Sequence, residues 1–215
     1  MATTVEELAR QVDAAAARTT ALERAADDLA SVRRVRDHLS SLQVPSAFLK
    51  TAPDDYYSWK LEQRAAFLGC QVQHLCKSII VENTSCTNSG IEDPRNSRYY
   101  CIVLQYNAKL NAEQLMRFVR ELIPEADRPG RKHFNFQHAP ADVSAELTGF
   151  QHNGVSPFAM AHPVPVIVAG DAAALPFLWL GGGAETVKLR IGVQQLITAL
   201  DAKVAPNLTT LRTDL

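Results

Sequence analysis

Residues 74–83 read HLCKSIIVEN, and residues 99–107 read YYCIVLQYN. Both stretches are short and rich in β-branched or aromatic residues, which is typical of β-strands. The chain between them, TSCTNSGIEDPRNSR, is polar and contains glycine and proline, as a surface loop does. The three stretches together predict a pair of antiparallel strands joined by a long loop.

Strand and helix patterns alternate after this pair. Asn111–Ile123 begins with a capping asparagine and has apolar residues at helical spacing, which predicts an amphipathic helix. Ala141–Gly149 predicts a shorter helix that ends on glycine. We expect three further strands at 164–170, 176–182 and 186–191, and a closing helix at 192–204. Because no regular β-α-β order emerges, a mixed or antiparallel sheet, either open or curled into a barrel, with helices packed outside fits the sequence better than a doubly wound fold.

The first 43 residues have a different pattern. No glycine or proline occurs before Pro45, so a helix can run through this region without a break. We expect an N-terminal helical arm at 1–43 and a second domain at 44–215, and both a straight rod and a hairpin folded near 30–34 fit the pattern. Acidic and basic residues nearly cancel along the arm, which favours packing on a partner helix or on the body over RNA binding. Apolar or small residues recur in steps of three and four at Val5, Leu8, Val12, Ala15, Thr19, Leu22, Ala26 and Leu29, and the stripe then shifts to Val32, Val35, Leu39 and Leu42.

Composition limits the class of protein. Of 215 residues, 47% are hydrophobic and 21% charged, and the formal net charge is −1, so any nucleic-acid contact has to be local. No apolar run approaches the roughly 18 residues that cross a bilayer, and the acidic N-terminus has no hydrophobic signal core. We therefore expect a cytoplasmic protein without a membrane or DNA partner. The four cysteines form no C-x-x-C pair and are expected to be reduced thiols.

Familiar cofactor and metal motifs are missing from the sequence. Neither phosphate-binding glycine loop occurs, and the six histidines lack the spacing of a metal site, so we expect no cofactor and no metal. Lys77 does stand out, because it falls inside an apolar strand. Its ammonium group either reaches solvent at the sheet edge or faces an anion in a cleft. The glycine- and proline-containing stretch 148–160 is either an ordinary loop or a rigid loop that presents backbone groups to a ligand.

The order of several segments resembles one known family. CKSIIV, APADVSAELTGF, NGVSPF, the VPVIV strand and WLGGG followed by a strand and a helix occur in the same order in the YbaK and prolyl-tRNA-synthetase-associated editing domains. The resemblance runs from about Val44 to about Ala205. It implies a mixed α/β fold with a largely antiparallel, barrel-like sheet and surrounding helices. It also implies an enzyme that hydrolyses the ester between a wrong amino acid and tRNA.

The resemblance also implies site residues. Lys77 occupies the place of the family's functional lysine, where it would hold a tRNA phosphate or the substrate, and Gly154 lies in the loop whose backbone would assist water attack. Asn153 stands where the family has a glycine, and tolerates the left-handed conformation better than other residues do. The basic turn 128–133 either contacts tRNA phosphates through Arg128, Arg131 and Lys132 or is simply solvated. The expected substrate-binding residues are Ser78, Phe150, Asn153, Val155, Ser156, Pro157, Gly181, Gly182 and Gly183.

Two functions from different classes follow from the resemblance. The first is a deacylase for mischarged tRNA, with Ala-, Ser- or Cys-tRNA as substrates and tRNA(Pro) favoured, in which a small pocket excludes the larger correct residue. The second is an inactive tRNA-binding or scaffold module. In either case the expected partners are the aminoacylated end of tRNA and a synthetase or multi-synthetase complex that binds the arm.

Overall fold

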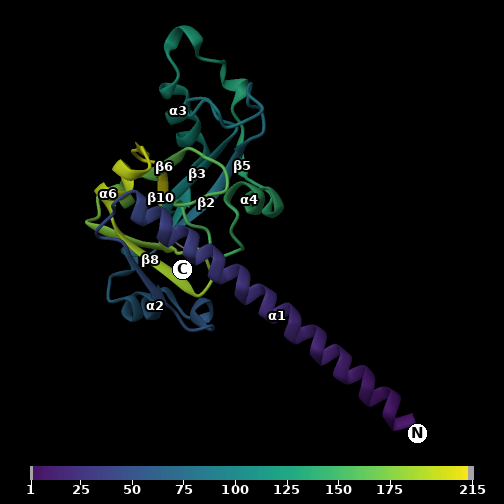
Figure 1. The fold of residues 1–215 in the computed structure, drawn as a ribbon. Helices are drawn as coiled ribbons and strands as arrows, with labels where there is room; N and C mark the ends of the chain where they lie inside the picture. Colours follow the sequence, from purple (N-terminus) through teal and green to yellow (C-terminus); the bar gives the residue numbers. More distant parts are fainter. Residues whose placement is uncertain (1, 213–215) are drawn as a thin grey trace.

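One long helix and a mixed α/β body make up the structure, a computed structural model that describes residues 2–212 (Figure 1). Helix α1 (Ala2–Ser41) is a single unbroken helix, so the rod is confirmed and the hairpin is wrong. Its first part projects from the body, whereas Val35 and Leu39 are buried in the core. The last part of α1 therefore belongs to the core of the body.

The strands pair in three sheets. Among the named strands of residues 2–212, all pairs are antiparallel except β3–β6 and β6–β9, which confirms the mixed, largely antiparallel fold. The five-stranded sheet has the order β5-β2-β3-β6-β9, and a bridge between Leu75 and Trp179 joins its β2 end to the three-stranded sheet β1-β8-β7. The strands are β1 (Phe48–Thr51), β2 (Cys76–Asn83), β3 (Tyr99–Gln105), β4 (Ala108–Leu110), β5 (Phe136–His138), β6 (Val166–Ala169), β7 (Phe177–Gly181), β8 (Val187–Gly192), β9 (Lys203–Ala205) and β10 (Thr209–Leu211).

The shorter helices pack around these sheets. In α3 the Asn111 side chain accepts hydrogen bonds from the N–H groups of Glu113 and Gln114, so the predicted cap is confirmed. Helix α4 ends at Gly149, which has a φ of 66°. The shorter helices are α2 (Leu61–Leu68), α3 (Ala112–Leu122), α4 (Ala141–Thr148), α5 (Gly170–Ala173) and α6 (Val193–Ala199).

The predicted closing helix at 192–204 is wrong in its last part. Helix α6 stops at Ala199, and Asp201 then turns the chain with a φ of 45°. Residues 203–205 form β9, which pairs parallel with β6. The stretch ends as a strand because an edge of β6 is available to it, which is a tertiary effect that helical spacing does not report.

Two apolar clusters hold the body together. The larger one surrounds β3, whose residues Tyr100–Leu104 are at most 1% exposed. The smaller one packs Tyr56 and Leu75 with Trp179 beside α2. All four cysteines are free thiols, as expected, and no helix within residues 2–212 combines the length and apolarity needed to cross a membrane.

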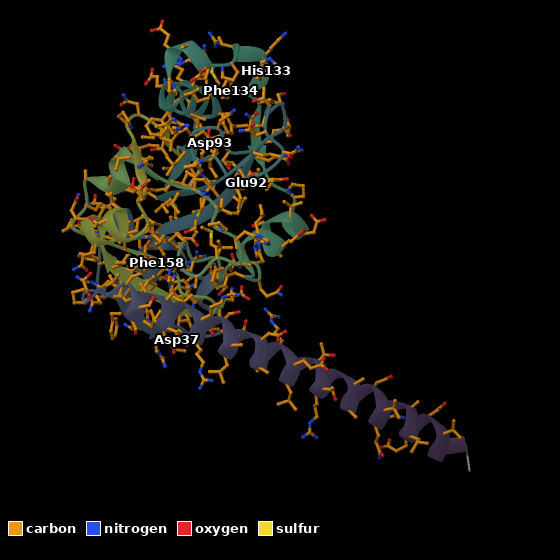
Figure 2. All side chains as sticks on the ribbon, turned by 45° about the horizontal axis from the view of Figure 1, so that its top comes forward. Asp37, Glu92, Asp93, His133, Phe134 and Phe158 are labelled. Carbon is orange, nitrogen blue, oxygen red and sulfur yellow. The ribbon has the colours of Figure 1, made fainter. Side chains whose placement is uncertain are left out.

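The body end of α1 holds the loop that follows Thr148. The Arg34 guanidinium lies 4.5 Å from the centroid of the Phe150 ring and donates to the carbonyl of Gly149 at 2.8 Å. His38 Nδ1 accepts a 2.7 Å hydrogen bond from the N–H of Ala159, a residue with a φ of 56°. The His38 ring also meets Phe158 edge-on, with centroids 6.1 Å apart, and Figure 2 labels Phe158 on the body close to this end of α1. Helix α1 is therefore part of the support for this loop.

The His38 contact predicts a pH dependence of stability. Nδ1 can accept from Ala159 only while the imidazole is neutral, and burial lowers the pKa of His38 below its ordinary 6.5. The stabilisation is thus fully present above pH 6.5 and is lost as pH falls through the folded-state pKa. Replacing His38 with Leu removes the acceptor for the Ala159 N–H and should cost about 1–3 kcal/mol at pH 8 and less in acid. Denaturant unfolding of both proteins across this range tests it, and a pH-independent difference between them would contradict it.

Candidate functional site

A cavity of about 420 Å³ opens between one edge of β2 and the loop at 152–155. It brings together the predicted site residues Lys77, Ser78, Asn153, Val155 and Gly181, which the chain supplies from three separate segments. The cavity lining also includes Ile79, Ile80, Tyr106, His138, Ala139, Ala141, Ser144 and His152, which the sequence did not single out.

The cavity exists because part of β2 has no strand on this edge. Along β2, pairing with β5 begins only at Val81. Leu75, which directly precedes β2, forms a bridge with Trp179. The Ile80 carbonyl accepts from the N–H of Ala139 at 3.0 Å, so Ile80 directs its backbone groups to this edge. Because backbone groups alternate edges along a strand, those of Ser78 face the same way.

Ser78 carries a buried polar group without a partner. Its side chain is only 8% exposed, and Oγ has no hydrogen-bond partner among the described residues. Leaving a buried hydroxyl unpaired costs about 1–3 kcal/mol. A polar substrate group in the cavity would satisfy this hydroxyl.

Lys77 lines the same cavity. Its side chain is half-buried, and Nζ lies 5.8 Å from the centroid of the Tyr106 ring. Burial, with a smaller contribution from Arg212, lowers the pKa of Lys77. The sequence left open whether Lys77 reaches solvent at the sheet edge or faces a cleft, and in the structure it lines a cavity.

A second hollow of about 470 Å³ shares Lys77, Ile79 and His138 with the first. It adds Lys109 of β4 and Arg212, beside β10. These two basic residues are 103 positions apart in the chain and come together only because β4 pairs with β10. The sequence offered no signal for this basic pair.

Asn153 shapes the loop as its residue type allows. It has a φ of 63°, so asparagine does adopt the left-handed conformation at the position where the family has glycine. Its Nδ2 donates to Glu185 at 2.9 Å, and its carbonyl accepts from the Tyr57 hydroxyl at 3.0 Å. The loop is thus tied to two other segments of the body.

A buried lysine completes this network. Lys188 is 4% exposed, and its Nζ donates to the Tyr57 hydroxyl and to the Glu185 carbonyl, both at 2.8 Å. Burial lowers the pKa of Lys188 to about 7, while Glu185 acts in the opposite direction. Lys188 falls in the apolar strand VKLRI, so the sequence shows here the same feature as at Lys77, a lysine inside an apolar strand.

Removing the Tyr57 hydroxyl should loosen the loop. Tyr57→Phe deletes the donor to Asn153 and the acceptor for Lys188, which leaves a buried amine short of one partner. We expect a loss of about 1–3 kcal/mol of stability. If the hydroxyl acts through Lys188, Lys188→Met should add little to it. Denaturant unfolding of both single variants and the double variant measures this, and strictly additive losses would contradict the shared network.

Gly154 packs tightly and uses both of its backbone groups. Its N–H donates to the Gln151 carbonyl at 3.1 Å, and its carbonyl accepts from Gly183 at 3.0 Å. A Cβ here would lie 3.1 Å from the Cα of Ala184. The N–H of neighbouring Val155, by contrast, donates to no acceptor found within residues 2–212. Val155 lines the cavity with its N–H available to a ligand, whereas Gly154 is not among the lining residues and its N–H is already used.

The three glycines of the β7–β8 turn differ in position. Gly181 lines the cavity, and a Cβ there would overlap the Val155 carbonyl oxygen. Gly182 is packed against Val187 and Leu49. Gly183 has a φ of 103° and faces the backbone of α1 at Ser31. Only the first of the three has access to a ligand in this cavity.

Several predicted residues do not line the cavity. Phe150 and Ser156 are buried, with Phe150 under Arg34 and the Ser156 hydroxyl accepting from the N–H of Phe158. Pro157 lines a different hollow of about 750 Å³. These three residues support the loop without lining the cavity.

The predicted phosphate contacts also lie outside the cavity lining. Arg128 donates to the Ile123 carbonyl at 3.2 and 3.1 Å, and Arg131 forms a 3.5 Å ion pair with Glu113. Lys132 is exposed. The turn lies beyond α3, near His133 at the top of Figure 2. Lys109 and Arg212, which the sequence interpretation did not name, line one hollow together with Lys77.

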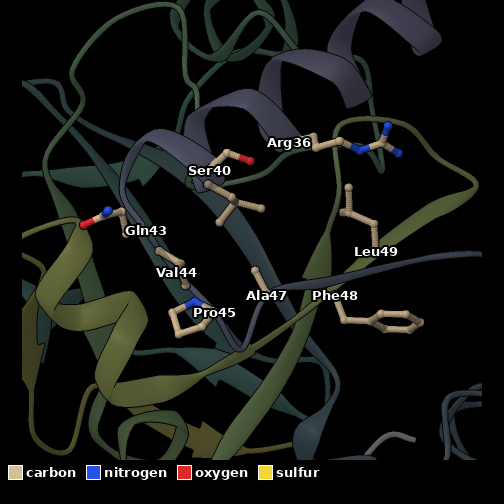
Figure 3. Close-up of a pocket in the computed structure, with 9 residues that line it drawn as sticks. Arg36, Ser40, Gln43, Val44, Pro45, Ala47, Phe48 and Leu49 are labelled. Atoms are coloured by element: carbon tan, nitrogen blue, oxygen red, sulfur yellow. The ribbon is translucent and has the colours of Figure 1, made fainter.

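Two other hollows within residues 2–212 are lined by neither Lys77 nor Ser78. The one in Figure 3, about 620 Å³, lies between the end of α1 and β1, and Arg36 is its only charged lining residue. The 750 Å³ hollow around Pro157 is mostly apolar. Within residues 2–212 no cluster of three or more His, Cys, Asp or Glu side chains is arranged to hold a metal ion.

Comparison with known proteins identifies the family. Residues 59–199 match the family described as the aminoacyl-tRNA editing domain, and this segment contains all of the cavity lining. The chain belongs to that family. A search of curated proteins gave no significant match.

Solved structures share the fold. One is described as a candidate trans-editing enzyme for prolyl tRNA synthetase, with a TM-score of 0.64, 20% identity, and coverage of 82% of this chain and 95% of that one. A scaffold protein used for computational epitope grafting gives a TM-score of 0.62 at 20% identity, covering 86% and 98%. A hypothetical protein gives 0.62 at 19% identity, covering 82% and 99%.

Proposed function

We propose that this protein hydrolyses the ester bond of mischarged aminoacyl-tRNA in the cavity beside β2. The observation that carries the proposal is the buried Ser78 hydroxyl, unpartnered among the described residues, in a cavity that Lys77 also lines. The match to the editing-domain family and the likeness to a candidate trans-editing enzyme support it.

The chemistry requires little more than positioning. A water oxygen attacks the ester carbonyl carbon, the bond to the ribose oxygen breaks, and the ribose oxygen leaves with a proton as the free hydroxyl of tRNA. The Ser78 hydroxyl and the Val155 N–H donate to the developing oxyanion. One such donor typically contributes about 3 kcal/mol to the transition state. The neighbouring ribose hydroxyl of the substrate helps to orient the water.

Basic side chains in the cavity and in the adjoining hollow orient the tRNA end. Lys77 holds a phosphate of the acceptor strand, and Lys109 and Arg212 extend the basic surface along the adjoining hollow. Such contacts neutralise phosphates without reading the base sequence. Cavity size then selects the amino acid, with Ala, Ser or Cys admitted and larger residues excluded.

The alternative function is a binding or scaffold module without turnover. An asparagine at the family's glycine position would favour this function if it changed the shape of the loop. Asn153 instead adopts the left-handed conformation, and its side chain donates a hydrogen bond to Glu185. The loop geometry therefore favours the deacylase.

A panel of mischarged tRNAs separates the two functions. The purified protein should hydrolyse Ala-, Ser- or Cys-tRNA(Pro) and spare Pro-tRNA(Pro), as measured by loss of labelled amino acid from the tRNA. Binding of these tRNAs with every ester left intact would establish the scaffold and overturn the deacylase.

A further inference from the structure

The projecting part of α1 carries an apolar stripe that no other segment within residues 2–212 covers. Val5, Leu8, Val12, Leu22 and Leu29 are between 61% and 72% exposed. With Ala15, Thr19 and Ala26 they recur in strict alternating steps of three and four, which is the a and d pattern of four heptads. Five large apolar side chains in one line on a solvent-exposed helix are the signature of a helix-packing seam.

This seam points away from the body. Arg24 contacts the body through a 3.1 Å ion pair with Glu185, and Ser31 meets Gly183. Both residues occupy f positions of the heptad, opposite a and d. At about 100° per residue, Leu22 and Leu29 lie roughly half a turn from them. A second helix can therefore lie along the seam without meeting the body.

The stripe that packs on the body is a different one. Val32 is half-buried, and Val35 and Leu39 are buried in the core. The shift of the apolar pattern after Leu29 marks the point where α1 changes from one packing face to the other. The seam is thus unused by the fold itself, and Figure 1 shows this part of α1 extending well clear of the body.

Charges beside the seam suit a second copy of the same chain. In a parallel pair, the g residue of one helix faces the e residue of the next heptad on the other helix. Arg18 is at g and Glu23 is at e, five positions later, so two symmetric ion pairs would form. A fully overlapped antiparallel pair would instead place Arg18 against Arg18 of the other copy.

We propose that residues 5–29 of two copies form a parallel two-stranded coiled coil. The two bodies then lie on the outer sides of the helix pair at the same end, because each contacts the face of its own helix opposite the seam. The proposal does not depend on the proposed deacylase activity.

Sedimentation equilibrium of the full chain tests the dimer. The expected mass is twice 23.6 kDa at high protein concentration. Leu22→Glu places a charge in the seam and should give the monomer, whereas the matched control Ala17→Glu, on the opposite f face, should leave the dimer intact. Circular dichroism checks that both variants remain folded. A wild-type monomer throughout, or equal effects of the two substitutions, would overturn the proposal.

Charge exchange tests the orientation. Arg18→Glu should weaken the dimer by roughly tenfold, because repulsion replaces both pairs. Adding Glu23→Arg should restore it. Oxidised Val12→Cys should also cross-link to itself beyond the wild-type background, because a residues meet their own copies in a parallel pair. Failure of the rescue, or cross-linking only between Val12→Cys and Leu22→Cys chains, would contradict the parallel arrangement.

Discussion

Gly181→Ala is expected to lower deacylation by roughly 100-fold in a protein that still folds. The added Cβ would overlap the Val155 carbonyl oxygen and come within 3.0 Å of the Gly154 carbonyl, both of which are backbone atoms. The loop at 153–155 must therefore move away from β7. That movement displaces the Val155 N–H from the β2 edge, and an error of about 1 Å in a positioned group costs this much.

The control for this substitution is Gly130→Ala. A Cβ at Gly130 would meet nothing within 4 Å, and its φ of −63° suits any residue. Single-turnover deacylation and thermal unfolding of both variants separate a site effect from a folding effect. Overpacking at Gly181 should cost about 1–3 kcal/mol of stability, which the fold can tolerate. Unchanged turnover in a folded Gly181→Ala protein would contradict the placement of the ester in this cavity.

Lys77→Ala is expected to lower kcat/KM by about 100-fold or more, since Lys77 is the one lysine or arginine in the cavity lining. Its half-buried position strengthens the interaction with a phosphate relative to a fully solvated lysine. Lys77→Arg keeps the charge but changes the shape of the head group, so it should retain part of the activity.

Lys203→Ala serves as the matched control for Lys77. Lys203 also lies in a strand, β9, but it forms an exposed ion pair with Asp201 and does not line the cavity. Its removal should leave turnover unchanged. If Lys77→Ala matches the wild type in kcat/KM, the lysine has no part in holding the substrate.

Local signals in the sequence predicted most of the fold. The Asn111 cap, the Gly149 stop and the alternating apolar residues of the β2–β3 pair each act within a few residues of the chain. The errors lie where distant segments decide. Strand β9 needs the edge of β6, and β1 with α2 was missed because four-residue and eight-residue elements give weak patterns.

The candidate site was only partly predictable for a similar reason. Lys77 stood out because a charge inside an apolar strand demands an explanation, and the structure places it at a cavity. Lys188 showed the same signal and was overlooked, although it is the more buried of the two. Tyr57 and Arg212 reach the site through tertiary contacts that no local pattern encodes.

Binding of a non-hydrolysable alanyl-adenosine amide, followed by backbone amide NMR, tests most directly whether the ester lies in the cavity beside β2. The amide signals of Ser78 and Val155 should shift together on saturation, because both residues would face the bound carbonyl. The signals of residues that line the 750 Å³ hollow around Pro157 and the 620 Å³ hollow of Figure 3 should stay in place. Shifts confined to either of those hollows, with Ser78 and Val155 unaffected, would contradict this placement of the ester.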